Sequence, residues 1–200
     1  GPARTQGKAF ERLTFNDKNP FAYSVSDLTT PFHSTTQGFS LNSGTALPFL
    51  NLGRVYVLTS PDTCSASEAI INGLRGAGVD VVTVGSTTCG KPYGFFATDN
   101  CGTTYFAIQF VGVNNLGQGD YSDGFAANCA ATDDFSKPLG DTGEGQLATA
   151  LRLNLTGACV PNASSASSLK RAPVTTDADD PTAVRDPRAA FKQQRILTRR

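Results

Sequence analysis

The chain has 200 residues, enough for one domain or for one domain with a tail. Its 17 basic and 17 acidic residues cancel, so charge gives no reason to expect a nucleic-acid partner or binding to an anionic membrane. No apolar run approaches the roughly 18 to 20 residues of a membrane-spanning helix, and we expect no membrane span.

Residues 1–52 are poor in long periodic segments. Residues 10–15 alternate as an edge strand does, whereas residues 16–37 are rich in Asn, Pro, Ser and Thr and predict a long loop. A loop of this length is usually functional or mobile. We interpret residues 1–52 as a loop-rich N-terminal segment of the domain that follows, and the one histidine, His33, as a surface residue of this loop.

A strand, a helix and a second strand come next. The apolar run within residues 54–59 predicts a buried strand, a Ser-x-x-Glu sequence opens a helix near 66–76, and residues 79–84 predict a second buried strand. This order in one sheet implies a right-handed crossover between parallel strands. Ser65 follows the first strand and Lys91 follows the second, so we expect their hydroxyl and amine at the same edge of the sheet.

Ser65 has a structural interpretation and a chemical one. Ser-x-x-Glu is a capping box, in which the serine hydroxyl accepts from the amide of Glu68 and Glu68 reaches back to the amide of Ser65. Most serines in this motif are helix caps and nothing more. The chemical interpretation needs a base within reach, because a serine is a weak nucleophile until a neighbour takes its proton.

The sequence Gly-Ser-Thr-Thr-Cys-Gly-Lys at residues 85–91 matches the phosphate-loop pattern G-x-x-x-x-G-K after a strand. That motif continues with a Ser or Thr that binds the metal and with a helix whose N-terminus faces the phosphates. Here Pro92 stands at the Ser/Thr position, and residues 93–96 are typical of extended chain. We therefore reject a nucleotide site.

Lys91 is the candidate base for Ser65. A lysine accepts a proton only when it is neutral, and burial among apolar groups lowers its pKa. The aromatic run at residues 93–96 predicts such a setting. The Ala66 amide, at the start of the helix, can bind the oxyanion of an acyl-transfer reaction. A pair of Ser65 with His33 is the weaker alternative.

The rest of the domain is predicted as a hairpin and a helix. Residues 93–97 and 103–111 predict two strands around a turn at 99–102. Residues 141–154 predict a helix with Glu144 in its first turn, where a negative charge is favourable.

The composition changes after Gly157. Residues 161–180 hold Ser, Ala, Thr, Asp and Pro with almost no large apolar side chains. We interpret residues 159–200 as a linker and flexible tail. An Asp-Pro step favours a short basic helix near 187–196, and an untethered terminal segment is the alternative.

Five cysteines indicate an oxidising compartment, periplasmic or extracellular, with five reduced thiols as the alternative. They form no Cys-x-x-Cys pair, and one histidine is too few for a zinc site, so we expect no metal. For the disulfides we predict Cys89 with Cys101, with Cys64 as the competing partner of Cys89, and Cys129 with Cys159.

Two motifs and the strand between them resemble one protease family. Cys-Ser-Ala-Ser-Glu-Ala-Ile at residues 64–70, followed after a strand by Gly-x-x-x-x-Gly-Lys at 85–91, is similar to the carboxy-terminal-processing, or tail-specific, serine proteases. The resemblance implies an α/β fold with a crotonase-like core of ββα units, and residues 53–158 as the protease catalytic core. It also implies Ser65 as nucleophile, Lys91 as general base, no cofactor and a polypeptide substrate.

Three features depart from that family's pattern. Many members place a glutamine four residues after the lysine, where this chain has Phe95. An upstream Asp-Leu-Arg…Gly-Gly motif, whose glycine amide would complete the oxyanion hole beside Ala66, has no match before Ser65, and no peptide-docking module is recognisable there. We therefore expect the C-terminal part of a longer protease, with the missing N-terminal part of the same protein as its partner and little or no activity alone. The alternative is a non-catalytic peptide-binding domain on the same fold.

Overall fold

The computed structural model describes residues 2–19, 23–38 and 40–160, which all belong to one unit of the chain that runs from residue 1 to 166. It opens with a short helix, α1 (Pro2–Thr5). The predicted tail at 159–200, with its helix near 187–196, lies outside the described residues apart from positions 159 and 160.

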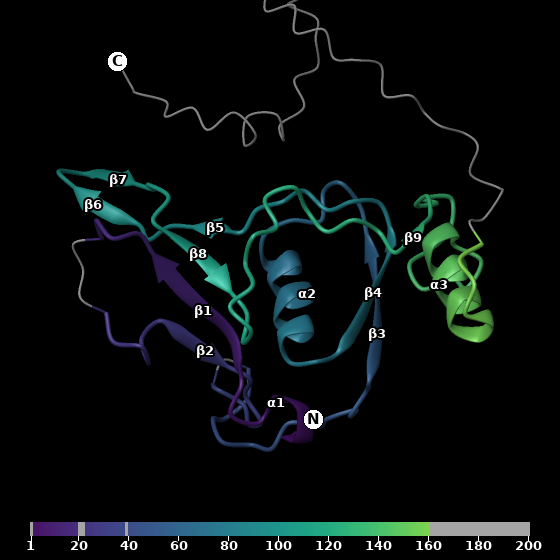
Figure 1. The fold of residues 1–200 in the computed structure, drawn as a ribbon, viewed down its shortest axis with the longest axis horizontal. Coiled ribbons are helices and arrows are strands. Elements are labelled where there is room, and N and C mark those ends of the chain that lie inside the picture. Colours follow the sequence, from purple (N-terminus) through teal and green to yellow (C-terminus); the bar gives the residue numbers. More distant parts are fainter. Residues whose placement is uncertain (1, 20–22, 39, 161–200) are drawn as a thin grey trace, which may run out of the picture. The chain divides into compact units, whose positions relative to one another are not determined.

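A parallel sheet with the strand order β3-β4-β9 lies between the helices α2 and α3 (Figure 1). β3 (Arg54–Thr59) and β4 (Asp80–Gly85) pair along their whole length, and β9 (Cys129–Ala130) pairs with the end of β4. The crossover between β3 and β4 is helix α2 (Ala66–Gly76). These bounds agree within one residue with the strand, helix and strand that the sequence predicts.

The alternation of side chains along β3 and β4 gives the sheet two buried faces. One face packs against α2 and is formed by odd-numbered residues of the strand segments, Val55, Val57, Val79 and Val81, with Ile71 and Leu74 of the helix. The other packs against α3 (Gly145–Thr156) and is formed by even-numbered residues, Tyr56, Val82 and Val84, with Ala150 and Leu153. Because successive side chains of a strand point to opposite sides, the two strands hold both helices.

A second sheet is antiparallel, with the order β2-β1-β8-β5. Its strands are β1 (Ala9–Phe15), β2 (Thr29–Pro31), β5 (Tyr93–Gly94) and β8 (Phe110–Val113). The strand predicted at 10–15 is confirmed, but its place at an edge is wrong, because β1 lies between β2 and β8. Alternating polar and apolar residues indicate that one face of a strand is exposed to solvent. They do not indicate whether the strand pairs with another strand along both of its edges.

One interrupted hairpin joins β5 to β8. At its tip β6 (Thr98–Asn100) pairs with β7 (Thr103–Tyr105), and at its base β5 pairs with β8. The turn between β6 and β7 consists of Cys101 and Gly102, with φ of 50° and 76°. Positive φ at both central residues is what a type I′ hairpin turn requires, which confirms the predicted turn.

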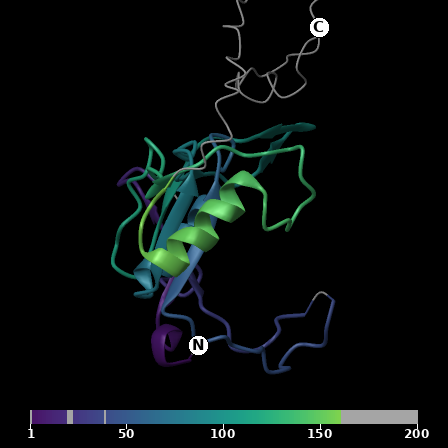
Figure 2. The same cartoon turned by 90° about the vertical axis from the view of Figure 1, so that its right-hand side faces the viewer.

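Helix α2 lies between the two sheets, and α3 covers the other face of the parallel sheet (Figures 1 and 2). A Cβ added at Gly73 of α2 would lie 2.7 Å from the ring of Phe10, so a glycine is needed where the helix packs against β1. The result is a mixed α/β fold. The repeated ββα units of a crotonase-like core stay a prediction.

Helix α3 begins later than the predicted 141–154. Glu144 is its N-cap rather than a residue of its first turn, since its carboxylate accepts from the amides of Gln146 and Leu147 at 2.9 and 2.8 Å. The helix ends at Gly157, whose φ of 70° suits a glycine C-cap. The glutamate therefore stabilises the helix by capping it directly.

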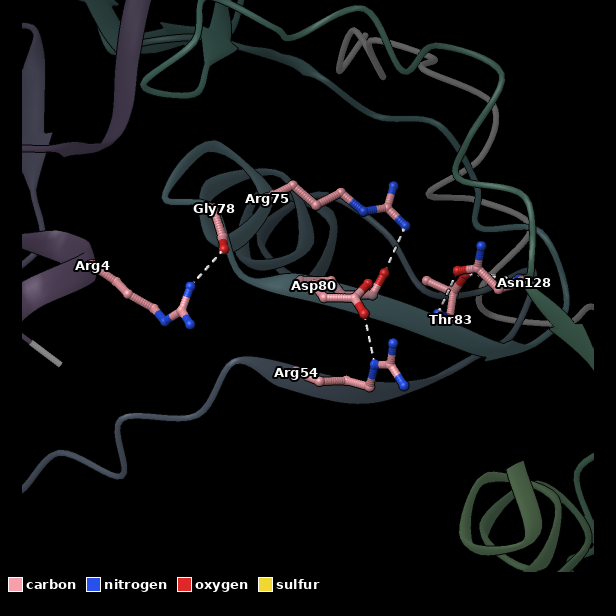
Figure 3. Close-up of polar contacts among 8 residues, drawn as sticks. Arg4, Arg54, Arg75, Gly78, Asp80, Thr83 and Asn128 are labelled. Atoms are coloured by element: carbon pink, nitrogen blue, oxygen red, sulfur yellow. Dashed lines mark hydrogen bonds and ion pairs between the residues drawn. The ribbon is translucent and has the colours of Figure 1, made fainter. Parts of the chain in front are cut away.

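Polar contacts hold the start of the parallel sheet, at the end remote from Ser65 (Figure 3). Arg54 Nε donates to Asp80 Oδ2 at 2.6 Å, where β3 and β4 begin. Further along β4, Asn128 Oδ1 accepts from the amide and the hydroxyl of Thr83 at 2.8 and 2.9 Å, which fixes the approach to β9. The ion pair is exposed and contributes little to stability, whereas Thr83 is fully buried and its contacts matter more.

Candidate active site

Ser65 is the N-cap of α2 and has an unusual backbone conformation, with φ 54° and ψ −111°. An ordinary N-cap residue is extended, in the β region. Positive φ in a residue other than glycine costs about 1 to 3 kcal/mol and persists only where the surroundings enforce it. The side chain is exposed and lies in the capping-box arrangement without making a cap hydrogen bond. Helix capping alone therefore does not explain the geometry of Ser65.

Glu68 links the loop of Ser65 to the loop of Lys91. Its side chain is fully buried, with 0 % exposure. Oxygen Oε2 accepts from the amides of Ser65 and Lys91 at 3.0 and 2.8 Å. Oxygen Oε1 accepts from the amide of Gly90 at 2.8 Å and from the hydroxyl of Thr88. Four donors occupy the lone pairs of an ionised carboxylate, which is how such a group can be buried.

This carboxylate brings the two predicted site residues together at the level of the backbone. Because both amides donate to one oxygen, the nitrogen atoms of Ser65 and Lys91 lie within about 6 Å of each other. The amide of Cys89 also donates to the carbonyl of Thr63 at 3.0 Å. The loops after β3 and β4 thus meet at one edge of the sheet. That the Lys91 amine lies within direct or one-water reach of the Ser65 hydroxyl stays a prediction.

The surroundings of Lys91 differ from the prediction. Its side chain is exposed, as are Tyr93, Phe95 and Phe96. Phe96 packs instead against Phe15 and Phe110 of the antiparallel sheet and against Tyr23 of the loop before β2, and Phe95 packs against Phe106 of the hairpin. The predicted desolvation of Lys91 is therefore wrong for the described residues, because these aromatic rings have partners of their own.

The backbone amide expected to bind an oxyanion lies at the start of α2. The next amide, that of Ser67, donates to the carbonyl of Cys64 at 3.1 Å, whereas the amide of Ala66 makes no hydrogen bond within the described part of the chain. Amides in the first turn of a helix have no partner within the helix and attract negative charge. The Ala66 amide is therefore suited to an oxyanion beside Ser65.

Sequence analysis missed the support beneath Lys91. Gly90 and Gly124 both have positive φ, 77° and 79°, and a Cβ on either would overlap the backbone of the opposite loop, at Ser122 and Thr88 respectively. The Thr88 hydroxyl, buried between them, also accepts from the amide of Phe125 at 2.7 Å. Glycines at these positions indicate a close backbone contact, but the sequence does not show which segments they contact.

Tyr93, two residues after Lys91, lines a cavity of about 850 Å³. Its wall includes Tyr93, Arg75 and the stacked rings of Tyr121 and Phe125, whose centroids are 4.8 Å apart. Burial raises the pKa of Tyr121 to about 12, and the charges of Glu11 and Glu68 add to the shift. The cavity therefore has aromatic walls that also carry the guanidinium of Arg75 and the phenol of Tyr121.

His33 lies elsewhere. It is exposed and lines a different cavity. Leu74, in the second half of α2, and Val79, just before β4, line the same cavity. Ser65 is at the opposite end of that helix, so the arrangement agrees with the interpretation of His33 as a surface residue. Among the described residues, no three His, Cys, Asp or Glu side chains form a cluster that could hold a metal ion.

Two disulfides are present, and one of the two predicted pairings is wrong. Cys64 pairs with Cys89, with Cα atoms 5.3 Å apart, and Cys129 pairs with Cys159 as predicted, at 5.5 Å. Cys101 is a free, exposed thiol at the hairpin turn. It cannot reach Cys89 because β6 carries the turn away from the Lys91 loop, whereas the contacts of Glu68 bring that loop to Cys64.

Comparisons with known proteins support the fold. No protein-family model matches the chain, and no curated protein matches it. Among solved structures, a protein from Bacteroides fragilis described as a candidate S41 protease superposes with a TM-score of 0.58 and 22% sequence identity. The match covers 78% of this chain and 38% of that protein, so the chain spans less than half of its length. No helix of the described residues is long and apolar enough to cross a membrane.

Proposed function

We propose that this chain carries the nucleophile and the general base of a serine-type endopeptidase, Ser65 and Lys91. The observation that carries the proposal is the backbone of Ser65, which is held at φ 54° and ψ −111° at a helix N-terminus by a buried carboxylate that also holds the Lys91 loop. A helix cap needs no such conformation, whereas a nucleophile exposed on a sharp turn between a strand and a helix is held in one. The shared fold with a candidate S41 protease supports the same function.

The proposed reaction uses these groups in order. The Ser65 hydroxyl attacks the scissile carbonyl carbon while Lys91, in its neutral form, takes the hydroxyl proton. The electron pair of the carbonyl moves to its oxygen, beside the amide of Ala66. The C–N bond then breaks, Lys91 passes the proton to the leaving amine, and water hydrolyses the acyl-enzyme. The cycle needs no metal or cofactor.

Because the Lys91 side chain is exposed, the described residues do not supply the apolar surroundings that a lysine base needs. A lysine that acts as a base is normally covered by apolar groups, and Lys91 has no such cover among the described residues. We propose that its cover comes from the polypeptide substrate or from a further part of a longer protein, which would also supply a second oxyanion donor. On this proposal the 200-residue chain is a weak enzyme alone.

The proposed substrate is an extended polypeptide, cleaved in C-terminal processing or in the degradation of unfolded protein. β5 begins two residues after Lys91 and is an edge strand of the antiparallel sheet, so a peptide can pair with it. The neighbouring cavity, with Tyr93, Tyr121 and Phe125, can accept an apolar side chain. The proposed location is an oxidising compartment, the periplasm or the exterior, and the two disulfides support it.

A serine-directed phosphonate probe tests the proposal. It should label Ser65 in the full-length protein, as shown by mass spectrometry of the modified peptide, and the variants Ser65→Ala and Lys91→Ala should abolish labelling. Ser67→Ala is the matched control, because Ser67 is an exposed serine in the first turn of the same helix. Undiminished labelling of the Lys91→Ala variant would remove the lysine from the mechanism.

A non-catalytic peptide-binding domain is the second candidate. Two observations favour it: Lys91 is exposed, and Phe95 stands where the resembled family has an orienting glutamine and packs against Phe106. Such a domain would bind unfolded polypeptide, measured by fluorescence anisotropy, without any phosphonate labelling of Ser65.

A further inference from the structure

The disulfide between Cys64 and Cys89 spans the two loops of the proposed site. Cys64 immediately precedes Ser65, and Cys89 lies two residues before Lys91. Its Cα atoms are 5.3 Å apart, and the amide of Cys89 donates to the carbonyl of Thr63 beside it. No other covalent link within the described residues joins these loops.

We propose that this disulfide positions Ser65 and makes the site sensitive to reduction. The inference rests on the proposed function and adds its regulation. Ser65 keeps a costly backbone conformation only as long as its surroundings enforce it. The hydrogen bonds from the amides of Ser65 and Lys91 to Glu68 join the loops non-covalently, whereas the loops cannot separate while the disulfide joins them. Reduction removes that restraint and lets Ser65 relax towards an ordinary, extended N-cap conformation.

The surroundings of the two sulfur atoms support a reducible bond. Cys64 and Cys89 are both partly exposed, so a reductant can reach the bond from either side; of the other disulfide, Cys129 is buried and Cys159 is exposed. Cys89 Sγ lies 3.8 Å from Glu68 Oε2, the same oxygen that accepts from Ser65 and Lys91. Once reduced, the Cys89 thiol is a donor next to that oxygen and competes with the two amides. Reduction thus weakens the hydrogen bonds of the site as well as its covalent link.

The chemical step is a dithiol–disulfide exchange. A thiolate of a dithiol reductant attacks one sulfur of the Cys64–Cys89 bond and forms a mixed disulfide, and the other protein sulfur leaves and takes up a proton. The second thiol of the reductant then attacks its own mixed-disulfide sulfur and releases the other cysteine. In total two electrons and two protons pass to the protein, and the reductant becomes a disulfide.

The test measures the rate of phosphonate labelling of Ser65 in the full-length protein during titration with dithiothreitol. We expect the rate to fall about tenfold or more on reduction, from the released backbone strain, and to recover on reoxidation with oxidised glutathione. A Cys64→Ala, Cys89→Ala variant should label at the reduced rate throughout. The matched control is Cys129→Ala, Cys159→Ala, which lacks the other disulfide and should still respond to dithiothreitol. Equal labelling rates in the oxidised and reduced protein would overturn the inference and leave the proposed function standing.

Hydrogen exchange provides a readout that does not depend on catalysis. Reduction should speed exchange at the amides of Ser65 and Lys91 and leave β1 and β8 unchanged. That response with no labelling in either state supports the positioning role and overturns the proposed function. Unchanged exchange at both amides, or faster exchange throughout β1 and β8, overturns the inference.

Discussion

The stretches before and after Lys91 are built in opposite ways. Before it, the loops that follow β3 and β4 meet in a polar network around the fully buried Glu68 and are joined by its hydrogen bonds and by a disulfide. After it, residues 93–106 carry aromatic side chains that are largely exposed, with Phe106 at 59 %. The comparison shows that hydrogen bonds fix the backbone of Ser65 and Lys91 in the proposed site. The described residues do not cover the side chain of Lys91.

The largest effect should come from Ser65→Gly, which separates chemistry from stability. Loss of the hydroxyl should lower peptidase turnover at least about 10⁴-fold, as expected for a nucleophile. The same change should raise the free energy of unfolding by about 1 kcal/mol, because glycine accepts positive φ. Kinetics on an unfolded-protein substrate and urea denaturation measure the two quantities.

Ser67→Gly is the control for that prediction. It should leave turnover unchanged and destabilise the protein by about 0.5 to 1 kcal/mol, since Ser67 has an ordinary helical position. If Ser65→Gly is no more stable than Ser67→Gly, the backbone of Ser65 is not strained and the main support for the nucleophile is lost.

The variant Glu68→Ala removes the acceptor at the centre of the polar network. Four donors would lose their common acceptor in a buried place, which should cost about 3 kcal/mol or more of unfolding free energy. Turnover and labelling of Ser65 should fall with it. Glu144→Ala, which removes the capping carboxylate of α3, should cost about 1 kcal/mol and leave labelling intact. Similar losses from the two variants, in urea denaturation, would contradict the central role given to Glu68.

The exposed side is tested by comparing the 200-residue chain with the longer protein to which we propose it belongs. A missing oxyanion donor and an uncovered Lys91 should make the chain about 10² to 10³-fold slower on an unfolded-protein substrate at equal concentration. Phosphonate labelling of Ser65 should slow in parallel. Comparable rates would show that the site is complete within these residues and that Lys91 needs no further cover.

The smallest effect concerns Tyr121, which lines the same cavity as Tyr93. Its pKa of about 12 in the folded protein exceeds the usual value of 10.0. Between these values the unfolded chain has lost the phenol proton and the folded protein still holds it, so stability should fall as pH rises from about 10 to 12. Denaturation of the wild type and of Tyr121→Phe over this range checks it, and the variant should show the weaker decline. Equal slopes would mean that Tyr121 is not buried as described.

Much of the local structure was predictable from the sequence. Apolar runs and their spacing located β3, α2 and β4 within one residue, because each of these elements places its apolar side chains at the period of its own geometry. The Cys-Gly turn of the hairpin and the hydrogen bond from the Ser65 amide to Glu68 were also predictable, since each depends on residues close together in the chain. By the same reasoning Ser65 and Lys91 could be expected at one edge of the sheet.

Other features depended on contacts between distant residues, and only the tertiary structure decided them. The sequence offered Glu68 as a partner of Ser65, but not as the acceptor for Thr88, Gly90 and Lys91 on the next loop. It offered aromatic side chains beside Lys91, but they pack on β1, β8 and the hairpin. It left Cys64 and Cys101 as rival partners of Cys89, and the buried carboxylate selected Cys64 by bringing the two loops together. Each outcome follows from which groups can be buried together with all their hydrogen bonds made, a condition that involves several loops at once.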